Sequence, residues 1–191
     1  MAMFVTGNLN LFDVESAKGF GYETVRDHLA DFIEQWYEDV KSDDDHVYII
    51  GNLSQYSPIA AMKTIRSLPG TKHLVTGPRD QISPDTKRGW EFAQEYYKTF
   101  VYTNTSIRRR IDGRDAILSF YGPDADCWWA PRQTDAYYIT AWQDIPEDDG
   151  STKISAPLVT PDELSVSWAS WNRMVNWEEV KDMVAHQDII D

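Results

Sequence analysis

The stretch Thr6–Asp13 reads TGNLNLFD and directly follows the apolar run Ala2–Val5 at the start of the sequence. The apolar run predicts a buried strand over residues 2–6, and the polar side chains that follow at alternate positions predict a loop. Many α/β proteins present ligand-binding groups in this way, at the carboxyl end of a strand. Here those groups are Asn8, Asn10 and Asp13, which include a single carboxylate and therefore form a weak set for binding metal.

The first half of the chain continues with alternating helix and strand patterns. Helices are indicated by apolar residues at helical spacing, by a closing Pro-Gly pair and by a Ser-Pro start, whereas strands are indicated by short apolar runs that end near glycine. The predicted elements are a helix over Thr24–Val40, a strand over His46–Ile50, a helix over Ile59–Leu68, a strand over Lys72–Thr76 and a helix from Ser83 to about Tyr97.

The second half is richer in strand patterns. Asp112–Gly113 is a two-residue hairpin signal, and the pattern Asn176 to Glu179 is a capping box that opens a last helix to about Ala185. The predicted strands are Ile107–Ile111, Arg114–Phe120, Ala136–Trp142 and Leu164–Trp168. Strand–helix alternation followed by strands predicts a layered α/β sandwich, and 191 residues suit one domain over residues 1–191.

Three loops should meet in such a sandwich, because the carboxyl ends of neighbouring parallel strands lie at the same edge of a sheet. They are TGNLNLFD, GNLS at 51–54 and GPRD at 77–80. Together with Leu164–Asn172 and the helix that follows, these loops resemble the calcineurin-like metallophosphoesterases, in particular the small phage and bacterial branch. That family shows T-S-D-x-H-F-G-H, then G-D, then G-N-H-D, and later a Ser-His pair. The resemblance implies an αββα sandwich with mixed sheets.

The chain departs from the family at the positions where the resemblance places two metal ions. Carboxylates are replaced by Asn8 and Asn52, and histidines by Asn10 and Arg79. The other departures are Pro78, which has no donor side chain, and Phe120, which stands in the place of a histidine. Asp80 is retained, and the resemblance gives it a supporting role rather than metal ligation. Two divalent ions need anionic ligands, so this degenerate site predicts a pseudoenzyme without metal or cofactor.

Two other interpretations remain open from the sequence. One is residual phosphodiester hydrolysis with a single weakly held metal, using Asp13, Asn8, Asn52 and Asp80. The other is a pocket without metal in which Arg79 holds a phosphate or nucleotide, since arginine suits phosphate recognition. The simplest reading of Asn8 and Asn52 is that their amides bind loop backbone and preserve the loop shapes.

Composition points to a binding role rather than to a membrane or nucleic-acid partner. The net charge is −13, which repels nucleic acid and anionic membranes, and no apolar run is long enough to cross a membrane. The single cysteine, Cys127, favours a reducing compartment, and we expect a cytoplasmic protein.

The resemblance to the phage branch suggests a phage factor that binds a host protein with a basic and apolar surface. A homo-oligomer would use the same surface. Tryptophan is favoured at interfaces, and the candidate surface residues are Trp128, Trp129, Trp142, Trp168 and Trp171.

Overall fold

The computed structural model describes residues 1–87, 89–123, 130–131, 136–141, 159–160 and 163–187. Its strands are β1 (Met3–Gly7), β2 (His46–Ile50), β3 (Thr71–Val75), β4 (Tyr102–Asn104), β5 (Ser106–Ile111), β6 (Arg114–Ser119), β7 (Tyr137–Thr140), β8 (Val159–Thr160), β9 (Glu163–Ser165) and β10 (Val175–Asn176). Its helices are α1 (Val14–Gly19), α2 (Val25–Asp39), α3 (Pro58–Ser67), the 3₁₀ turn η1 (Gly89–Glu91), α4 (Ala93–Thr99), α5 (Trp168–Trp171) and α6 (Trp177–Gln187). The expected α/β class is therefore confirmed.

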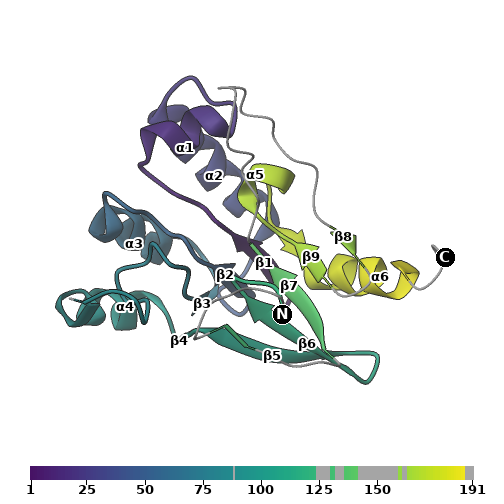
Figure 1. Ribbon diagram of the computed structural model, residues 1–191. Helices are drawn as coiled ribbons and strands as arrows, with labels where there is room; N and C mark the ends of the chain where they lie inside the picture. Colours follow the sequence, from purple (N-terminus) through teal and green to yellow (C-terminus); the bar gives the residue numbers. More distant parts are fainter. Residues whose placement is uncertain (88, 124–129, 132–135, 142–158, 161–162, 188–191) are drawn as a thin grey trace, which may run out of the picture.

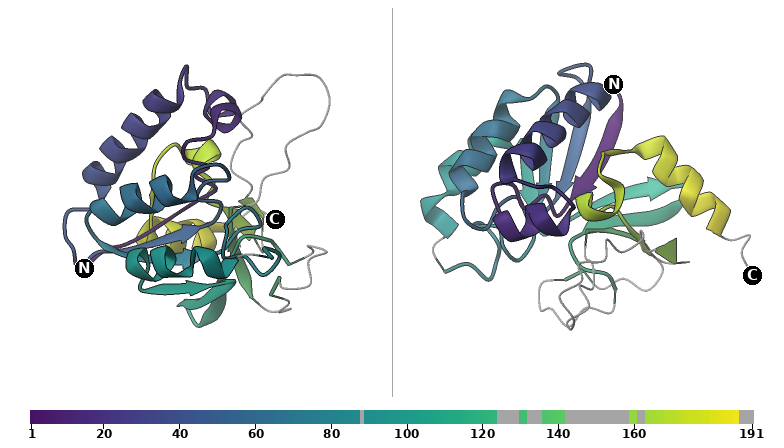
Figure 2. Two further views of the ribbon diagram at one scale, coloured as in Figure 1. Left: turned by 90° about the vertical axis from the view of Figure 1, so that its left-hand side faces the viewer. Right: turned by 90° about the horizontal axis from the view of Figure 1, so that it is seen from above.

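The strands form two mixed sheets. The first has the order β10-β1-β2-β3-β4, in which β1 to β4 run parallel and β10 is antiparallel. The second has the order β5-β6-β7-β9-β8 and combines antiparallel and parallel pairs. Figure 2 shows helices on one side of the first sheet and the second sheet on the other. The carboxyl ends of β1, β2 and β3 consequently lie side by side, as the sequence predicts.

Alternate residues of β1, β2 and β3 enter two different cores. On β2, Val47 and Ile49 pack with the helices, whereas Tyr48 and Ile50 pack against the second sheet. Both cores exclude water, and the period of two follows from the opposite directions of successive strand side chains. A strand buried on both faces reads as a continuous apolar run, which explains why His46–Ile50 was predictable with its bounds.

Three predicted elements differ from the structure. No helix spans Ser83 to Lys87, because Thr86 is tied back into a turn: its hydroxyl donates to the Asp80 carbonyl and its N–H to the Ser83 carbonyl. The strand expected over Leu164–Trp168 ends at Ser165, and Trp168 begins α5 instead. The capping box forms only in part, since Asn176 accepts the Glu178 N–H while Glu179 pairs with Arg173 at 2.5 Å.

The run Arg108 to Arg110 lies on β5, at an edge of the second sheet. Arg108 and Arg110 both reach Asp115 on the neighbouring strand, at 3.5 and 3.4 Å. Arg109 points the other way and lies over the Tyr48 ring at 4.7 Å. β5 is therefore a salt-bridged edge strand, on which the alternation of side chains sends Arg108 and Arg110 to one face and Arg109 to the other.

Tyr48 belongs to a stack of planar groups at the start of β2 and β3. The rings of Tyr48 and His73 are parallel at 4.5 Å, and His73 in turn stacks on His46 at 5.0 Å. The Nδ1 of His46 and the Nε2 of His73 are 2.8 Å apart and share a hydrogen bond. Burial, with the nearby His46 and Arg109, lowers the pKa of His73 to about 4. The stack therefore packs a neutral imidazole between the sheets.

His28 is a second buried imidazole, on the inner face of α2. Its ring stacks on Tyr22 at 4.9 Å and meets the edge of Phe20 at 5.3 Å. Neither ring nitrogen has a hydrogen-bond partner among the described residues. Burial lowers the pKa of His28 to about 4, against the opposing charges of Asp31 and Asp13. The native fold therefore holds His28 neutral at pH values where an unfolded histidine is charged.

We expect the acid sensitivity of folding to depend on His28. Because its native pKa is depressed, its contribution to stability is complete above pH 6.5 and is lost as pH falls toward 4. Replacing His28→Phe should keep the ring packing and make the free energy of unfolding fall less steeply across this window, by up to about 3 kcal/mol. Urea unfolding at several pH values measures this slope.

The exposed Gln55 carries no titratable group, so Gln55→Ala serves as the control and should leave the slope unchanged. Other titrating groups are common to all three proteins, so they cancel in the comparison. An identical slope for wild type and His28→Phe would contradict the assignment of a buried neutral imidazole.

Candidate functional site

The three predicted loops meet at the carboxyl ends of β1, β2 and β3. Backbone hydrogen bonds join the first two, because the N–H groups of Asn10 and Leu11 donate to the carbonyls of Asn52 and Leu53 at 2.9 and 2.8 Å. Asn8, Asn10 and Phe12 have positive φ angles of 52°, 44° and 65°. Asparagine tolerates this left-handed conformation better than other residues with side chains. The first loop therefore turns sharply at alternate residues and places Asn8 and Asn10 against the second loop.

The second and third loops approach each other at two glycines. An added Cβ on Gly51 would lie 2.1 Å from the backbone nitrogen of Gly77, and one on Gly77 would lie 2.5 Å from Asn52 Oδ1. Neither position has room for a side chain larger than hydrogen. The glycines that end both strands in the sequence are the signal for this close approach, although the sequence alone does not show that they touch.

Three asparagine side chains form one hydrogen-bonded network at this junction. The backbone N–H of Arg79 donates to Asn52 Oδ1 at 2.9 Å, which fixes the amide of Asn52 with its Nδ2 facing Asn8. Nδ2 of Asn52 donates to Asn8 Oδ1 at 3.1 Å, and Nδ2 of Asn10 donates to the same oxygen at 3.0 Å. Amides satisfy each other here without any cation. The prediction that these amides bind loop backbone is confirmed for Asn52, which accepts the Arg79 N–H, whereas the Asn8 side chain accepts two other side-chain amides instead.

The two carboxylates of the predicted site bind backbone instead of facing an open space. Asp13 is buried and caps α1 by accepting the Ser16 N–H at 2.7 Å. Asp80 is fully buried, and its two oxygens accept the N–H groups of Leu53 and Gly77 at 2.7 and 2.8 Å. Burial raises the pKa of Asp80 to about 6, against the lowering effect of these two hydrogen bonds. Asp80 therefore ties the second loop to the third.

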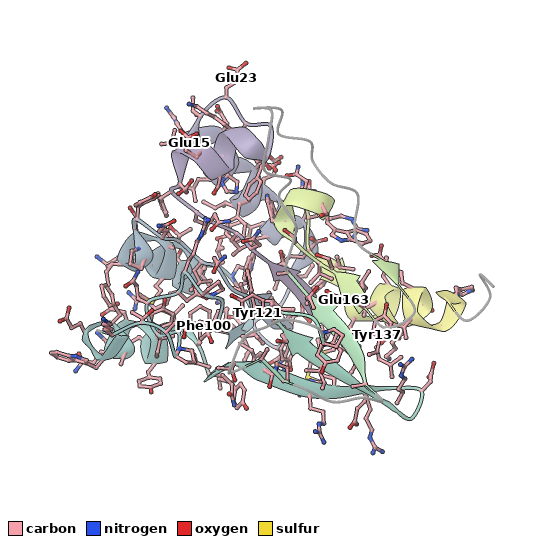
Figure 3. All side chains as sticks on the ribbon, in the orientation of Figure 1. Glu15, Glu23, Phe100, Tyr121, Tyr137 and Glu163 are labelled. Carbon is pink, nitrogen blue, oxygen red and sulfur yellow. The ribbon has the colours of Figure 1, made fainter. Side chains whose placement is uncertain are left out.

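Phe120 covers the third loop. It follows β6 and is buried in the core between the sheets. The space where Gly77 would carry a Cβ lies 2.8 Å from its ring, so ring and loop backbone are in direct contact. Tyr121, which Figure 3 labels near the middle of the molecule, meets the Phe120 ring edge-on at 5.1 Å. Of the remaining residues, Pro78 is half-buried and Arg79 is exposed.

The predicted site residues Asn8, Asn10, Asn52, Asp80, Arg79 and Phe120 are thus brought together, and Asp13 lies in the same loop system.

The tryptophan residues predicted to form an interaction surface lie in different environments. Trp168 is fully buried against Phe32 at 5.3 Å, so it is wrong as a surface residue. Trp171 is half-buried and donates its indole N–H to the Ser165 carbonyl at 2.8 Å. Trp128, Trp129 and Trp142 lie outside the described residues.

The donor chemistry at the loops does not suit a pair of divalent metals. Among the described residues, no group of three or more His, Cys, Asp or Glu side chains is placed to hold a metal ion. The one acceptor left open in the amide network is the buried Asn10 Oδ1. A neutral amide oxygen binds a divalent ion far more weakly than a bridging carboxylate does.

Comparison with known proteins gives relatives from phages. No family model matches the chain. It is similar to the Gene 66 protein of Mycobacterium phage L5, 27% identical over 183 residues that cover 86% of this chain and 84% of that protein. It is also similar to the Gene 66 protein of Mycobacterium phage D29, 25% identical over 174 residues and 83% of each chain. These relatives are consistent with the expected phage protein.

Among solved structures, the chain is similar to AQ665 of Aquifex aeolicus, which is described as a protein of unknown function. The TM-score is 0.63 with 13% identity, over 95% of this chain and 98% of that one. At this level of identity the likeness shows the fold alone.

In the described part of the chain, no helix is long and apolar enough to cross a membrane.

We expect Asp80 to be the most sensitive side chain of the site. Replacing Asp80→Ala leaves the N–H groups of Leu53 and Gly77 buried without acceptors, which should cost about 2–4 kcal/mol of unfolding free energy. Asp80→Asn turns one acceptor into a donor and should also destabilise. Urea unfolding at pH 7.5 measures both, with the exposed Glu23→Gln as the control, which should change stability by less than about 0.5 kcal/mol. Wild-type stability in Asp80→Ala would contradict the role of a tie between loops.

Restoring a carboxylate at position 52 should destabilise the protein. In Asn52→Asp, an anionic oxygen faces Asn8 Oδ1 in a buried position, so one hydrogen bond is lost and a charge is added. The expected cost is about 2 kcal/mol at pH 7.5. Thermal unfolding measures the change, with the exposed Gln55→Glu as the matched control for charge. Added manganese should not restore the loss, and a rise above wild-type stability with manganese would show that the loops still accept a metal.

Proposed function

We propose that this chain is a catalytically inactive, phage-encoded protein with a metallophosphoesterase-like αββα scaffold that acts by binding another protein. One observation carries the proposal: Asn8 Oδ1 accepts two amide N–H groups, at the place where the resemblance would put an aspartate ligand. The two mixed sheets and the meeting of the three strand ends support the scaffold. The Gene 66 relatives support a phage origin.

The charge of the loop side chains favours the amide network over a two-metal centre. Two divalent ions a few Å apart repel each other, and at an effective dielectric constant of 20 this repulsion is on the order of 10 kcal/mol or more. Anionic ligands offset it in two-metal enzymes. Asn8 and Asn52 contribute no charge here, and Arg79 adds a positive one at the rim. The loops therefore lack the negative charge that a two-metal reaction needs.

The interpretation with one weakly held metal has little support from the contacts. Its two carboxylates, Asp13 and Asp80, are both committed to backbone N–H groups. A metal would have to displace those hydrogen bonds and open the loops. Binding of a phosphate without metal has the exposed Arg79 in its favour, but the open group of the network, Asn10 Oδ1, is an acceptor and repels an anion.

A protein without catalytic groups still offers a folded surface, and folds often serve functions unrelated to an ancestral chemistry. Exposed aromatic side chains on this chain include Tyr56, Trp90 and Tyr97, each at least 70% exposed. Aromatic residues of this kind carry much of the binding energy in protein interfaces. A host protein is the partner that a phage origin favours.

We expect the purified protein to hydrolyse a generic aryl phosphodiester with added manganese no faster than buffer with manganese alone. A two-metal phosphodiesterase assayed alongside serves as the positive control. Elemental analysis after gel filtration should find no retained transition metal. Turnover that disappears in Asn52→Ala would overturn the proposal, because it would place catalysis at the amide network.

A further inference from the structure

Charge is distributed very unevenly along this acidic chain. Residues 51–111 contain ten Lys and Arg against four Asp and Glu, a net charge of +6. Residues 1–50 and 112–191 carry −8 and −11. At physiological ionic strength, charges are screened beyond about 8 Å, so a ligand close to the surface responds to the local charge rather than to the total of −13.

The basic segment builds one side of the fold. It contains α3, β3, η1, α4, β4 and β5, and α3 packs directly on α4 through contacts that include Arg66 to Glu95 at 3.1 Å. In Figure 1, α3 and α4 lie together at one side, away from α1 and α6. The acidic residues Glu15 and Glu23, labelled in Figure 3, project at the end formed by α1 and the start of α2. The sign of the local charge thus differs between parts of the surface.

Exposed apolar side chains gather on the same basic side. Trp90, Tyr97, Val101 and Tyr102 are 77%, 70%, 75% and 45% exposed. Trp90 in η1 and Tyr97 in α4 are seven residues apart, which places them along one face of a nearly continuous helix, and Val101 and Tyr102 follow the extended residue Phe100 that ends α4. The opposite face, with Tyr96 and Phe100, is buried in the core. Tyr56, which precedes α3 in the same basic segment, is 70% exposed, and elsewhere in the described chain the exposed large apolar residues are Met1, Val14 and Tyr37.

Two lysines, one on the neighbouring helix α3 and one three residues before Trp90, are available to a partner. Lys63 on α3 and Lys87 before η1 are exposed, and neither forms an ion pair or hydrogen bond within the described residues. By contrast, Arg66 and Lys98 both pair with Glu95, at 3.1 and 2.8 Å. We define the α4 flank as Trp90, Tyr97, Val101 and Tyr102 with Lys63 and Lys87. It combines exposed rings with unpaired positive charge.

We propose that the α4 flank is the docking surface of this protein and that it binds an acidic, partly apolar segment of another protein. The net charge of −13 alone predicts a basic partner, whereas the two lysines of the α4 flank favour an acidic partner. Trp and Tyr supply large rigid contact area, and the two lysines select carboxylates at its rim. The inference rests on the proposed function only in taking the role of the protein to be binding.

Two other occupants fit the α4 flank less well. Single-stranded nucleic acid stacks on aromatic rings but needs many cations for its phosphates. The α4 flank offers only two lysines, and the exposed Glu91 lies beside Trp90. A second copy of the chain supplies acidic surface but few exposed apolar groups on it, since Met1, Val14 and Tyr37 are the exposed large apolar residues described outside residues 51–111. An acidic protein segment with apolar side chains matches both properties of the α4 flank.

Selection from a random library of twelve-residue peptides tests the proposal on the full chain. We expect enriched peptides to combine Asp or Glu with aromatic or aliphatic residues, and their affinity to fall at least tenfold for the double variant Trp90→Ser/Tyr97→Ser. Lys63→Glu/Lys87→Glu should reduce the affinity for the same peptides and make it less sensitive to salt. Tyr37→Ser removes an equally large exposed ring from the acidic part of the surface and should bind like wild type. Thermal unfolding checks that all variants fold, which is expected because the replaced side chains are exposed.

Several outcomes would overturn the proposal. These are enrichment of basic peptides, binding that survives both double variants, and no enrichment at all. Tighter binding of a fluorescent twenty-residue oligothymidine through the same residues would assign the α4 flank to nucleic acid instead. Dimerisation that disappears in Trp90→Ser/Tyr97→Ser, measured by sedimentation, would assign it to a second copy. None of these results bears on manganese-dependent turnover, so the two proposals fail independently.

Discussion

The orientation of the amide side chains at the strand ends depends on the hydrogen bond from the Arg79 N–H to Asn52 Oδ1. A backbone N–H is only a donor, so it fixes which end of the Asn52 side chain is oxygen and which is nitrogen. The nitrogen then faces Asn8, whose oxygen must accept, and Asn10 completes the set. A single backbone contact from the third loop therefore sets the direction of the amides in the first two, and Asn10 Oδ1 is the one acceptor of the network that stays open among the described residues.

The network stays in place because close backbone contact and shared hydrogen bonds hold the loops together. Gly51 and Gly77 bring two backbones within contact distance, and Asp80 accepts an N–H group from each of the loops that contain them. Phe120 covers the same point from the second sheet. Here glycine contacts, a buried carboxylate and an aromatic ring occupy the junction.

Much of this arrangement follows from local sequence, and the remainder depends on contacts that sequence patterns do not report. Strands such as His46–Ile50 are recognisable because burial on both faces makes them uniformly apolar. The loops that follow them are placed by the parallel pairing, which made Asn8, Asn52 and Asp80 predictable as neighbours. The turn at Thr86 was not predictable, because it depends on the Asp80 carbonyl rather than on helix propensity. Burial of Trp168 likewise depends on tertiary packing against Phe32, which composition does not reveal.

The separation of positive and negative charge along the chain has a consequence for how the molecule meets other molecules. Within the described residues, the net −8 of residues 1–50 and the excess of Lys and Arg in residues 51–111 lie on different elements, which gives this part of the molecule an electric dipole moment in addition to its net charge. In the field of a charged surface such a dipole rotates during approach, so the encounter is oriented before any side chains touch. Dissolved ions weaken this torque as they weaken the field. The net charge of −13 therefore governs the interaction with other molecules only at long range, where it repels anions. At close range, the orientation of the molecule decides whether an acidic surface is repelled or attracted.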